Sequence, residues 1–205
     1  MKIVFDFGGV LFNWHPPSFL ARVWPHRIAT VEDGAAAAKT FFQQYGGDWG
    51  LFDQGLIGAE EVVQRIAART GWPVEDVEAV LHAVPGELAL MPDTAALIAE
   101  LRAAGHTLHY LSNMPEPFAD HLEGAHPLHE WFESGLFSGR IKHIKPGAEI
   151  FQLAEQQFGA PQELLFLDDH PANVAAVRER GWQAILFTGA AAARRELVER
   201  GLLTD

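Results

Sequence analysis

The sequence predicts an α/β fold: a Rossmann-like, doubly wound parallel sheet core with an α-helical domain inserted near the start of the chain. Four short apolar runs, each of strand length, occur at residues 2–7, 108–113, 164–169 and 183–187. Helical stretches accompany these runs, and each has a proline near its start and a glycine at its end. These stretches are residues 92–105, 146–159 and 171–181. Strands that alternate with helices of this length are typical of a parallel sheet with helices on both faces.

Residues 14–88 do not follow this alternation. They contain helical patterns, such as those at residues 32–46 and 58–71, without an apolar run of strand type between them. We therefore expect an α/β core domain built from residues 1–13 and 89–205 and a helical cap domain built from residues 14–88. An insertion at this point would lie above the carboxyl ends of the strands, from where it could close over a ligand.

The composition narrows the classes of partner. The 205 residues include 15 basic and 27 acidic side chains, which gives a net charge of −12 with histidine neutral. This charge repels polyanions, so we expect neither nucleic acid nor a membrane as a partner. The absence of cysteine excludes disulfides and thiolate metal sites, and it fits a reducing compartment. We expect a cytoplasmic protein, a monomer or a weak homodimer, that acts on a small molecule.

Polar residues stand where the predicted strands end. Asp6 closes the first apolar run, Ser112 and Asn113 close the second, and Asp168 and Asp169 close the third. In sheets of this kind, ligands bind at the carboxyl ends of the strands. A carboxylate beside a glycine turn can be approached closely by a ligand, and it can attack a phosphoryl group. Asp6 is therefore the candidate nucleophile.

Four segments, in order along the chain, carry a resemblance to a known family. They are DFGGVLF at residues 6–12, LSN at 111–113, KPGAEIF at 145–151 and FLDDHPANV at 166–174. Together they resemble the motifs of the haloacid dehalogenase superfamily, and the resemblance covers nearly the whole chain. It points to subfamily IA, with a helical cap after the first motif, and to members similar to α-D-glucose-1-phosphate phosphatase. The resemblance implies a Mg²⁺-dependent phosphatase that hydrolyses a small phosphomonoester.

The resemblance also assigns roles to individual residues. Asp6 would form an aspartyl-phosphate, while the Ser112 hydroxyl and the Lys145 ammonium would bind the phosphoryl group. Lys142 lies close to Lys145 in the sequence and is the alternative for its role. Further contacts to phosphate or substrate are expected from Gly8, Gly9 and Asn113.

A Mg²⁺ site is implied by the same motifs. Asn173 would hydrogen-bond to the metal ligands rather than bind the metal itself. A phosphate dianion approaches a group of carboxylates only when cations offset their charge, so the acidic residues lead to the same expectation. The implied ligands are Asp6, the backbone carbonyl of Gly8, Asp168 and Asp169.

The sequence departs from the family pattern at Gly8. Most phosphatases of the superfamily carry an aspartate two residues after the nucleophile, where it protonates the leaving oxygen and later activates water. Three explanations stay open: an active subset of the family that also has glycine here, proton transfer by the nearby His15, or a catalytically silent protein that binds a phosphometabolite or a protein partner. A 2-haloacid dehalogenase ranks lower, because Asp168 and Asp169 would repel the carboxylate of a haloacid.

The cap would select the substrate. It is rich in aromatic residues, and most of these would build its own core. Trp49 and Phe52, in the glycine-containing segment WGLFDQG at residues 49–55, are the candidates for facing the site. The expected substrate is a small phosphorylated metabolite, for example a sugar phosphate.

Overall fold

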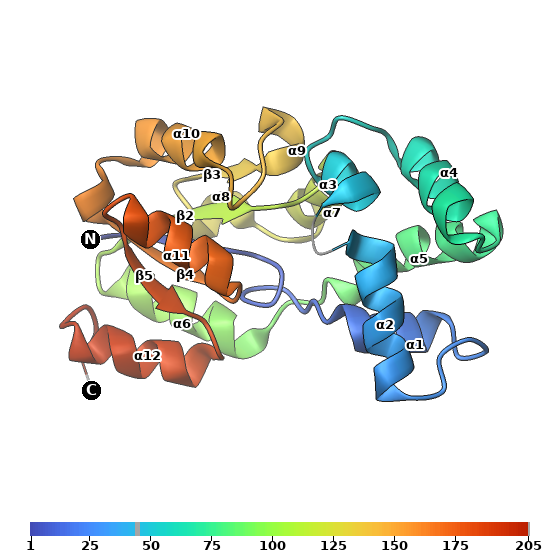
Figure 1. Ribbon diagram of the computed structural model, residues 1–205. Helices are drawn as coiled ribbons and strands as arrows, with labels where there is room; N and C mark the ends of the chain where they lie inside the picture. The colour runs from blue at the N-terminus through green and yellow to red at the C-terminus, as the bar shows by residue number, and fades with distance from the viewer. Residues whose placement is uncertain (44–45, 205) are drawn as a thin grey trace.

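The computed structural model describes residues 1–43 and 46–204, and this part of the chain contains a five-stranded sheet (Figure 1). Its strands are β1 (Lys2–Phe5), β2 (Thr107–Ser112), β3 (Ser134–Phe137), β4 (Leu164–Asp168) and β5 (Gln183–Leu186). The order is β3-β2-β1-β4-β5, and all neighbouring pairs are parallel. The predicted α/β class is therefore confirmed. Because β1 lies in the middle, the ends of β2 and β4 flank the residue that follows it.

Strand β3 has no counterpart among the predicted strands. Its sequence, SGLF, is short, and only Phe137 is buried. A side chain at position 135 would overlap the ring of Tyr110 on β2, so glycine is needed there. A short edge strand with a glycine lacks the apolar run by which strands are recognised in a sequence.

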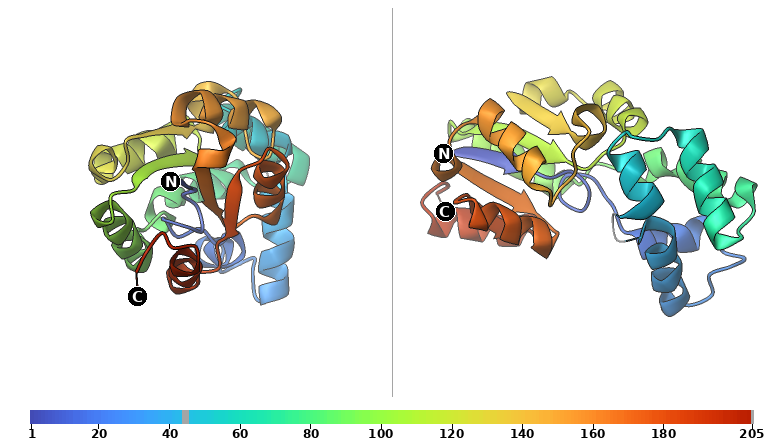
Figure 2. Two further views of the ribbon diagram at one scale, coloured as in Figure 1. Left: turned by 90° about the vertical axis from the view of Figure 1, so that its left-hand side faces the viewer. Right: turned by 45° about the horizontal axis from the view of Figure 1, so that its top comes forward.

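Helices cover both faces of the sheet (Figure 2). Four of them are α6 (Pro92–Ala103), α10 (Ala148–Phe158), α11 (Pro171–Glu179) and α12 (Ala190–Glu199). Val4 lies in one apolar cluster with residues of α10 and α11, whereas Ile3 and Phe5 lie in another with residues of α6 and α12. This alternation along β1 follows the strand period of two. Shorter segments complete this part of the molecule: α7 (Glu116–Ala125), α8 (Leu128–Trp131), α9 (Ser138–Ile141) and the 3-10 turn Pro161–Glu163.

A group of helices, which we call the cap helices, lies between β1 and α6 in the chain and beyond the carboxyl ends of the strands (Figure 1). They are α1 (Pro16–Val23), α2 (Val31–Phe42), α3 (Gly47–Asp53), α4 (Ala59–Thr70) and α5 (Val74–Glu87). Thr30 and Asp33 form a capping box at the start of α2. The Phe41 ring lies 5.8 Å from that of Trp24 and 5.7 Å from that of Trp49, so aromatic side chains pack the helices together. On this basis we propose residues 14–88 as a cap domain.

The two segments that join the cap helices to the sheet pair with each other. The Asn13 N–H donates to the Ala89 carbonyl at 2.8 Å, and the Met91 N–H donates to the Leu11 carbonyl at 2.9 Å. The Asn13 side chain also donates to Glu87, the last residue of α5, at 2.8 Å. Entry to and exit from the cap helices therefore form one short paired connection.

A second contact lies on the opposite side of the cap helices, between the end of α3 and α9. The Ser138 hydroxyl donates to the Asp53 carbonyl at 2.6 Å, and the Lys142 ammonium donates to the Gly55 carbonyl at 2.8 Å. Gly55 has a φ of +65°, and a side chain there would overlap the Gly139 carbonyl. The end of α3 is thus held close to the carboxyl edge of the sheet.

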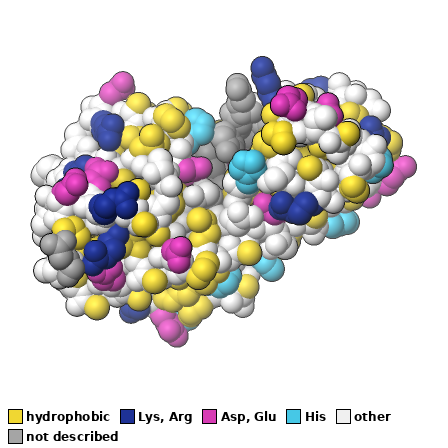
Figure 3. Space-filling model, turned by 90° about the horizontal axis from the view of Figure 1, so that it is seen from below, with side chains coloured by type: hydrophobic (Ala, Val, Ile, Leu, Met, Phe, Trp, Pro, Cys, Tyr) yellow, Lys and Arg dark blue, Asp and Glu magenta, His cyan; other side chains and the backbone are white. Residues whose placement is uncertain are grey.

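The surface carries charges of both signs. Lys and Arg side chains are mixed with Asp and Glu side chains on the face seen in Figure 3, so the described residues form no continuous basic patch there. In the described part of the chain, no helix combines the length and the apolar character required to cross a bilayer.

Candidate active site

Asp6 directly follows β1 at the carboxyl edge of the sheet. Its backbone N–H donates to the Leu167 carbonyl at 2.9 Å, so the pairing with β4 extends to this residue. Its carboxylate Oδ1 accepts a hydrogen bond from the Phe7 N–H at 2.7 Å. The residue is 8% exposed. The strand pairing and the bond from Phe7 therefore hold the carboxylate in one orientation.

The turn after Asp6 depends on two glycines for different reasons. Gly9 has a φ of +74°, and a Cβ there would overlap the Asp169 carboxylate. A Cβ at Gly8 would lie 3.4 Å from the Cβ and 3.5 Å from the Cγ of Trp14. Trp14 therefore packs beside position 8 in ordinary van der Waals contact, and Gly9 allows Asp169 to approach the turn.

Lys145 is the cation at Asp6. Its ammonium lies 2.8 Å from Asp6 Oδ1 and 2.7 Å from Asp168 Oδ2, and the residue is 2% exposed. Asn113 fixes the backbone of Lys145: the Asn113 Oδ1 accepts from its N–H at 2.8 Å, and the Asn113 Nδ2 donates to its carbonyl at 3.0 Å. The end of β2 thereby positions a lysine between residues that follow β1 and end β4.

Asp168 and Asp169 stand in different surroundings at the end of β4. Asp168 is fully buried, and both of its carboxylate oxygens lie 3.0 Å from the Asn173 Nδ2. Its Oδ1 also accepts from the His170 N–H at 2.8 Å. Asp169 is exposed and lies beside the turn at Gly9. Asp168 is thus a fixed charge, while Asp169 keeps an open carboxylate.

The three carboxylates suit a single hard cation. Asp6, Asp168 and Asp169 each offer an oxygen, and these oxygens lie within 4.8 Å of one another. An all-oxygen donor set is what Mg²⁺ prefers in proteins. Because Asp168 already accepts several hydrogen bonds, the other two carboxylates are the more available ligands. The residues present therefore fit Mg²⁺.

The electrostatics of the cluster also favour a further cation. Burial raises the pKa of Asp6 to about 8, and the nearby Asp168 and Asp169 carboxylates act in the same direction while Lys145 opposes them. Burial and the Asp168 charge also raise the pKa of Asp169. Burial disfavours the Lys145 ammonium, but the charges of Asp168 and Asp6 outweigh it and raise the pKa of this lysine. One ammonium thus offsets only part of the negative charge of three carboxylates.

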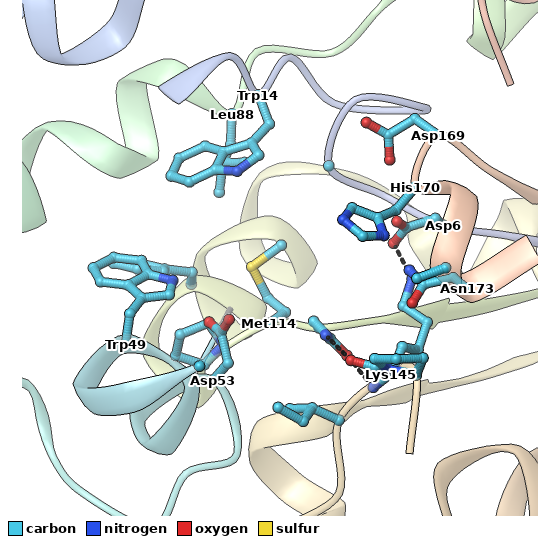
Figure 4. Close-up of a pocket in the computed structure, with 18 of the residues that line it drawn as sticks. Asp6, Trp14, Trp49, Asp53, Leu88, Met114, Lys145, Asp169, His170 and Asn173 are labelled. Atoms are coloured by element: carbon cyan, nitrogen blue, oxygen red, sulfur yellow. Dashed lines mark hydrogen bonds and ion pairs between the residues drawn. The ribbon is translucent and has the colours of Figure 1, made fainter. Parts of the chain in front are cut away.

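A cavity of about 560 Å³ opens over this cluster (Figure 4). It lies between the strand ends and the cap helices, and it contains residues from all four sequence motifs or their immediate neighbours. Sequence candidates among its described lining residues are Asp6, Gly8, Trp49, Asn113, Lys145, Asp169 and Asn173. The structure therefore brings the polar strand ends and one of the two aromatic candidates to the same place.

Several other sequence candidates are near the cavity but are not among its described lining residues. Ser112 is buried at the end of β2, and its hydroxyl has no hydrogen-bond partner within the described residues. Gly9 lies next to Asp169, on the side of the turn away from Trp14. Phe52 packs behind the wall, with its ring 5.6 Å from that of Trp49 and 5.8 Å from that of Phe118.

Two sequence candidates have a structural role elsewhere. His15 is exposed at the start of α1, where its Nδ1 accepts from the Ser18 N–H at 3.4 Å and lies 2.7 Å from the Ser18 hydroxyl. An imidazole used as a helix cap outside the cavity is not placed to transfer a proton there. Lys142, the alternative to Lys145, binds the Gly55 carbonyl and so joins α9 to the segment after α3.

The sequence reasoning did not select several side chains that line the cavity, among them Trp14, Asp53 and His170. Asp53 ends α3 and is 3% exposed. Burial raises the pKa of its carboxyl well above the usual value, and hydrogen bonding with Trp49 offsets only part of this. A signal for Asp53 was present, because it is the only charged residue in the segment WGLFDQG and lies four residues after Trp49, on the same helix face.

Curated relatives of known function match nearly the whole chain. The chain is 26% identical over 200 residues to the sesquiterpene phosphatase AstK of Aspergillus oryzae, and the aligned region covers 95% of this chain and 93% of the relative. It is also 26% identical over 209 residues to D-ribitol-5-phosphate phosphatase of Bacteroides thetaiotaomicron, with 96% of each chain covered. The chain is therefore similar over its full extent to two phosphatases whose named substrates differ in chemistry.

A solved structure shares the fold. It is a haloacid dehalogenase family enzyme of Bacteroides thetaiotaomicron in complex with magnesium and inorganic phosphate, with a TM-score of 0.70 and 23% identity over 90% of this chain and 92% of that one. The family described as haloacid dehalogenase-like hydrolase matches residues 3–191 of the sequence. With the sheet order and the motif residues gathered at one edge, this match shows that the chain belongs to the haloacid dehalogenase-like hydrolases.

Proposed function

We propose that the protein is a Mg²⁺-dependent phosphatase that hydrolyses a small phosphomonoester through an aspartyl-phosphate on Asp6. The observation that carries this proposal is the placement of the buried Lys145 ammonium between Asp6 and Asp168 at the base of a cavity. Full-length similarity to two phosphatases supports the reaction class, and a structural neighbour that holds magnesium and phosphate supports the metal.

The first step would use one oxygen of Asp6. Its Oδ1 is bound by the Phe7 N–H and the Lys145 ammonium, so we assign the attack on phosphorus to Oδ2. The new bond joins Oδ2 to phosphorus, and the bond from phosphorus to the ester oxygen breaks. The alcohol leaves with a proton from a nearby acid. Water then attacks the phosphorus of the aspartyl-phosphate, which releases phosphate and restores Asp6.

The other core residues would bind the phosphoryl group or hold the groups that do so. The free hydroxyl of Ser112 is available to donate to a phosphoryl oxygen. The side-chain amide of Asn113 is committed to the backbone of Lys145, so its task is to position the lysine. Mg²⁺ would be held by Asp6, Asp169 and the Gly8 carbonyl, with Asp168 as ligand or hydrogen-bond partner. When bound, it would offset the charge of the phosphate and of the leaving oxygen.

The acid that protonates the leaving oxygen would come from the cap helices. Gly8 has no side chain, Trp14 packs beside it, and His15 is exposed at the start of α1, where its imidazole caps the helix. Asp53 lines the same cavity from α3 (Figure 4), and burial raises the pKa of its carboxyl well above the usual value, which favours the protonated form that an acid needs. Ser138 fixes the backbone of this residue against α9. We therefore assign the proton donor to Asp53.

The first prediction concerns turnover. Wild-type protein with Mg²⁺ should release phosphate from a phosphomonoester such as p-nitrophenyl phosphate, and Asp6→Asn should lower the rate roughly 10³-fold or more, because the amide cannot attack phosphorus. Phosphate release is measured with Mg²⁺ and with EDTA. Asp93→Asn, which changes an exposed aspartate at the start of α6, is the control and should keep the wild-type rate. Absence of release by wild type from all esters would favour the silent binding protein.

The second prediction concerns the proton donor. Asp53→Asn should slow hydrolysis of an alkyl phosphate about 10²-fold or more, because an alkoxide needs a proton as it leaves. Hydrolysis of p-nitrophenyl phosphate should change little, since nitrophenolate leaves without one. Asp48→Asn is the matched control, because Asp48 lies on the same helix but pairs with Arg69 outside the cavity. Equal losses with both leaving groups would contradict the assignment to Asp53.

The third prediction concerns pH and stability. The pKa of Asp6 in the folded chain is about 8, above its value in the unfolded chain, so the folded state binds the extra proton. The stability linked to this proton is present below pH 4 and is lost as the pH rises to 8. Asp6→Asn should therefore raise the melting temperature of the metal-free protein more at pH 8 than at pH 5. Thermal unfolding in EDTA measures this, and an equal rise at both pH values would refute it.

A further inference from the structure

The wall of the cavity is largely apolar away from the carboxylate cluster, with Asp53 as its one carboxyl among the described lining residues there. Figure 4 shows Trp14, Trp49, Leu88 and Met114 around the space on the side away from Asp169. Val84 of α5 and Phe118 of α7 also line it. These side chains come from the cap helices, from the segments beside them, from the segment after β2 and from α7, so several separate elements build the apolar side of the space.

The aromatic part of this wall is a continuous packed layer. The Phe42 ring lies 5.4 Å from that of Trp14 and 4.7 Å from that of Trp49, and both contacts are edge to face. The Trp49 ring also stacks on that of Phe118 across the boundary between cap helices and core, at 6.5 Å. Rings packed in this way keep their positions, so they shape the space for an apolar ligand without having to rearrange.

The polar groups that line the cavity are mostly committed to one another. Lys145 binds two carboxylates, Asn113 binds the backbone of Lys145, and the Asn173 amide donates to Asp168. Asp53 is the only carboxyl of the described lining outside the strand-end cluster; it is 3% exposed, and burial raises its pKa and so favours its neutral form. A polyol or sugar would bury several hydroxyls here with few partners, and each unpaired hydroxyl lowers affinity.

From this arrangement we infer that the site takes phosphate monoesters whose alcohol is a hydrocarbon chain or ring system with few or no hydroxyls. The inference rests on the proposed function, because it places the phosphate at Asp6 and Lys145. A cavity of about 560 Å³ lies in the range that holds a small organic ligand, ~300 to 1,000 Å³. The sugar phosphate expected from the sequence is the competing substrate class, and the binding experiment compares the two.

Binding of n-alkylphosphonates tests the inference without turnover, since their carbon–phosphorus bond is not hydrolysed by a phosphatase. Calorimetry with Mg²⁺ would compare methyl-, butyl-, hexyl- and octylphosphonate. Each added methylene should tighten binding about two- to fourfold until the cavity is filled, as expected for burial of apolar surface. Ribitol 5-phosphate, tested with the Asp6→Asn variant, should bind no tighter than methylphosphonate.

A matched pair of variants tests whether the alkyl chain of the ligand lies in the cavity. Val84→Thr adds a hydroxyl to the cavity wall at nearly constant volume and should weaken octylphosphonate roughly two- to tenfold while leaving methylphosphonate unchanged. Val80→Thr makes the same change one turn earlier on α5, at a buried position outside the described lining, and should leave both affinities unchanged.

Two results would overturn the inference. One is an affinity for alkylphosphonates that does not rise with the length of the alkyl chain. The other is a dependence of affinity on alkyl length that Val84→Thr leaves intact, since the alkyl chain would then lie outside the cavity. Hydrolysis of p-nitrophenyl phosphate reports separately on the proposed function. Turnover without a length dependence would refute the hydrocarbon substrate alone, while a length dependence without turnover would support the ligand class and refute the phosphatase.

Discussion

The site depends on one interaction, the buried Lys145 ammonium held between the carboxylates of Asp6 and Asp168. Charges removed from water are stable only when they are paired and hydrogen-bonded, and here each carboxylate has a further donor: the Phe7 N–H for Asp6, and Asn173 for Asp168. Removal of the Lys145 ammonium would leave two buried carboxylates without their shared cation. The ion pairs among Lys145, Asp6 and Asp168 therefore join the segments that carry them at the carboxyl edge of the sheet.

The parallel topology explains why these groups meet. Residues that follow β1 and end β2 and β4 supply Asp6, Asn113 and Asp168, and those strands are neighbours in the sheet. Lys145 does not follow a strand end, so it needs separate fixing, which the Asn113 amide provides by binding both its N–H and its carbonyl. The sheet thus places the Asp6 and Asp168 carboxylates directly. The Asn113 amide, which follows β2, fixes the backbone of Lys145 beside them.

Sequence patterns predicted this half of the site because strand ends are visible in a sequence. An apolar run that stops at a polar residue marks the carboxyl edge, so Asp6, Asp168 and Asp169 could be grouped before any contact was known. Strand β3 was missed, since a four-residue edge strand with Gly135 has no such run. The core helices α6, α10 and α11 were found from their prolines and glycines, which act locally and do not depend on tertiary packing.

The half of the cavity that faces the cap helices was harder to predict. Helix periodicity shows which side chains share one face of a helix, but not which element or cavity that face contacts. Trp49 and Phe52 lie three residues apart on α3, yet Trp49 reaches the cavity while Phe52 packs behind it against Phe118. His15 was selected for its chemistry and its closeness to Gly8 in the chain, but the start of α1 uses its imidazole as a cap. Side-chain direction in such segments is decided by packing between elements.

Gly8 and Trp14 connect the chemistry of the site to its shape. A Cβ at position 8 would lie 3.4 Å from the Trp14 Cβ, in ordinary van der Waals contact, so the Trp14 side chain packs directly beside this turn. With glycine at position 8, the turn after the nucleophile carries no side-chain carboxyl, and the Trp14 side chain presents apolar surface beside it. The only carboxyl left in the described lining away from the strand ends is Asp53 on α3. Gly8 thus leaves the turn after the nucleophile without a side-chain acid and Trp14 adds apolar surface beside it, which fits a proton donor carried by the cap helices.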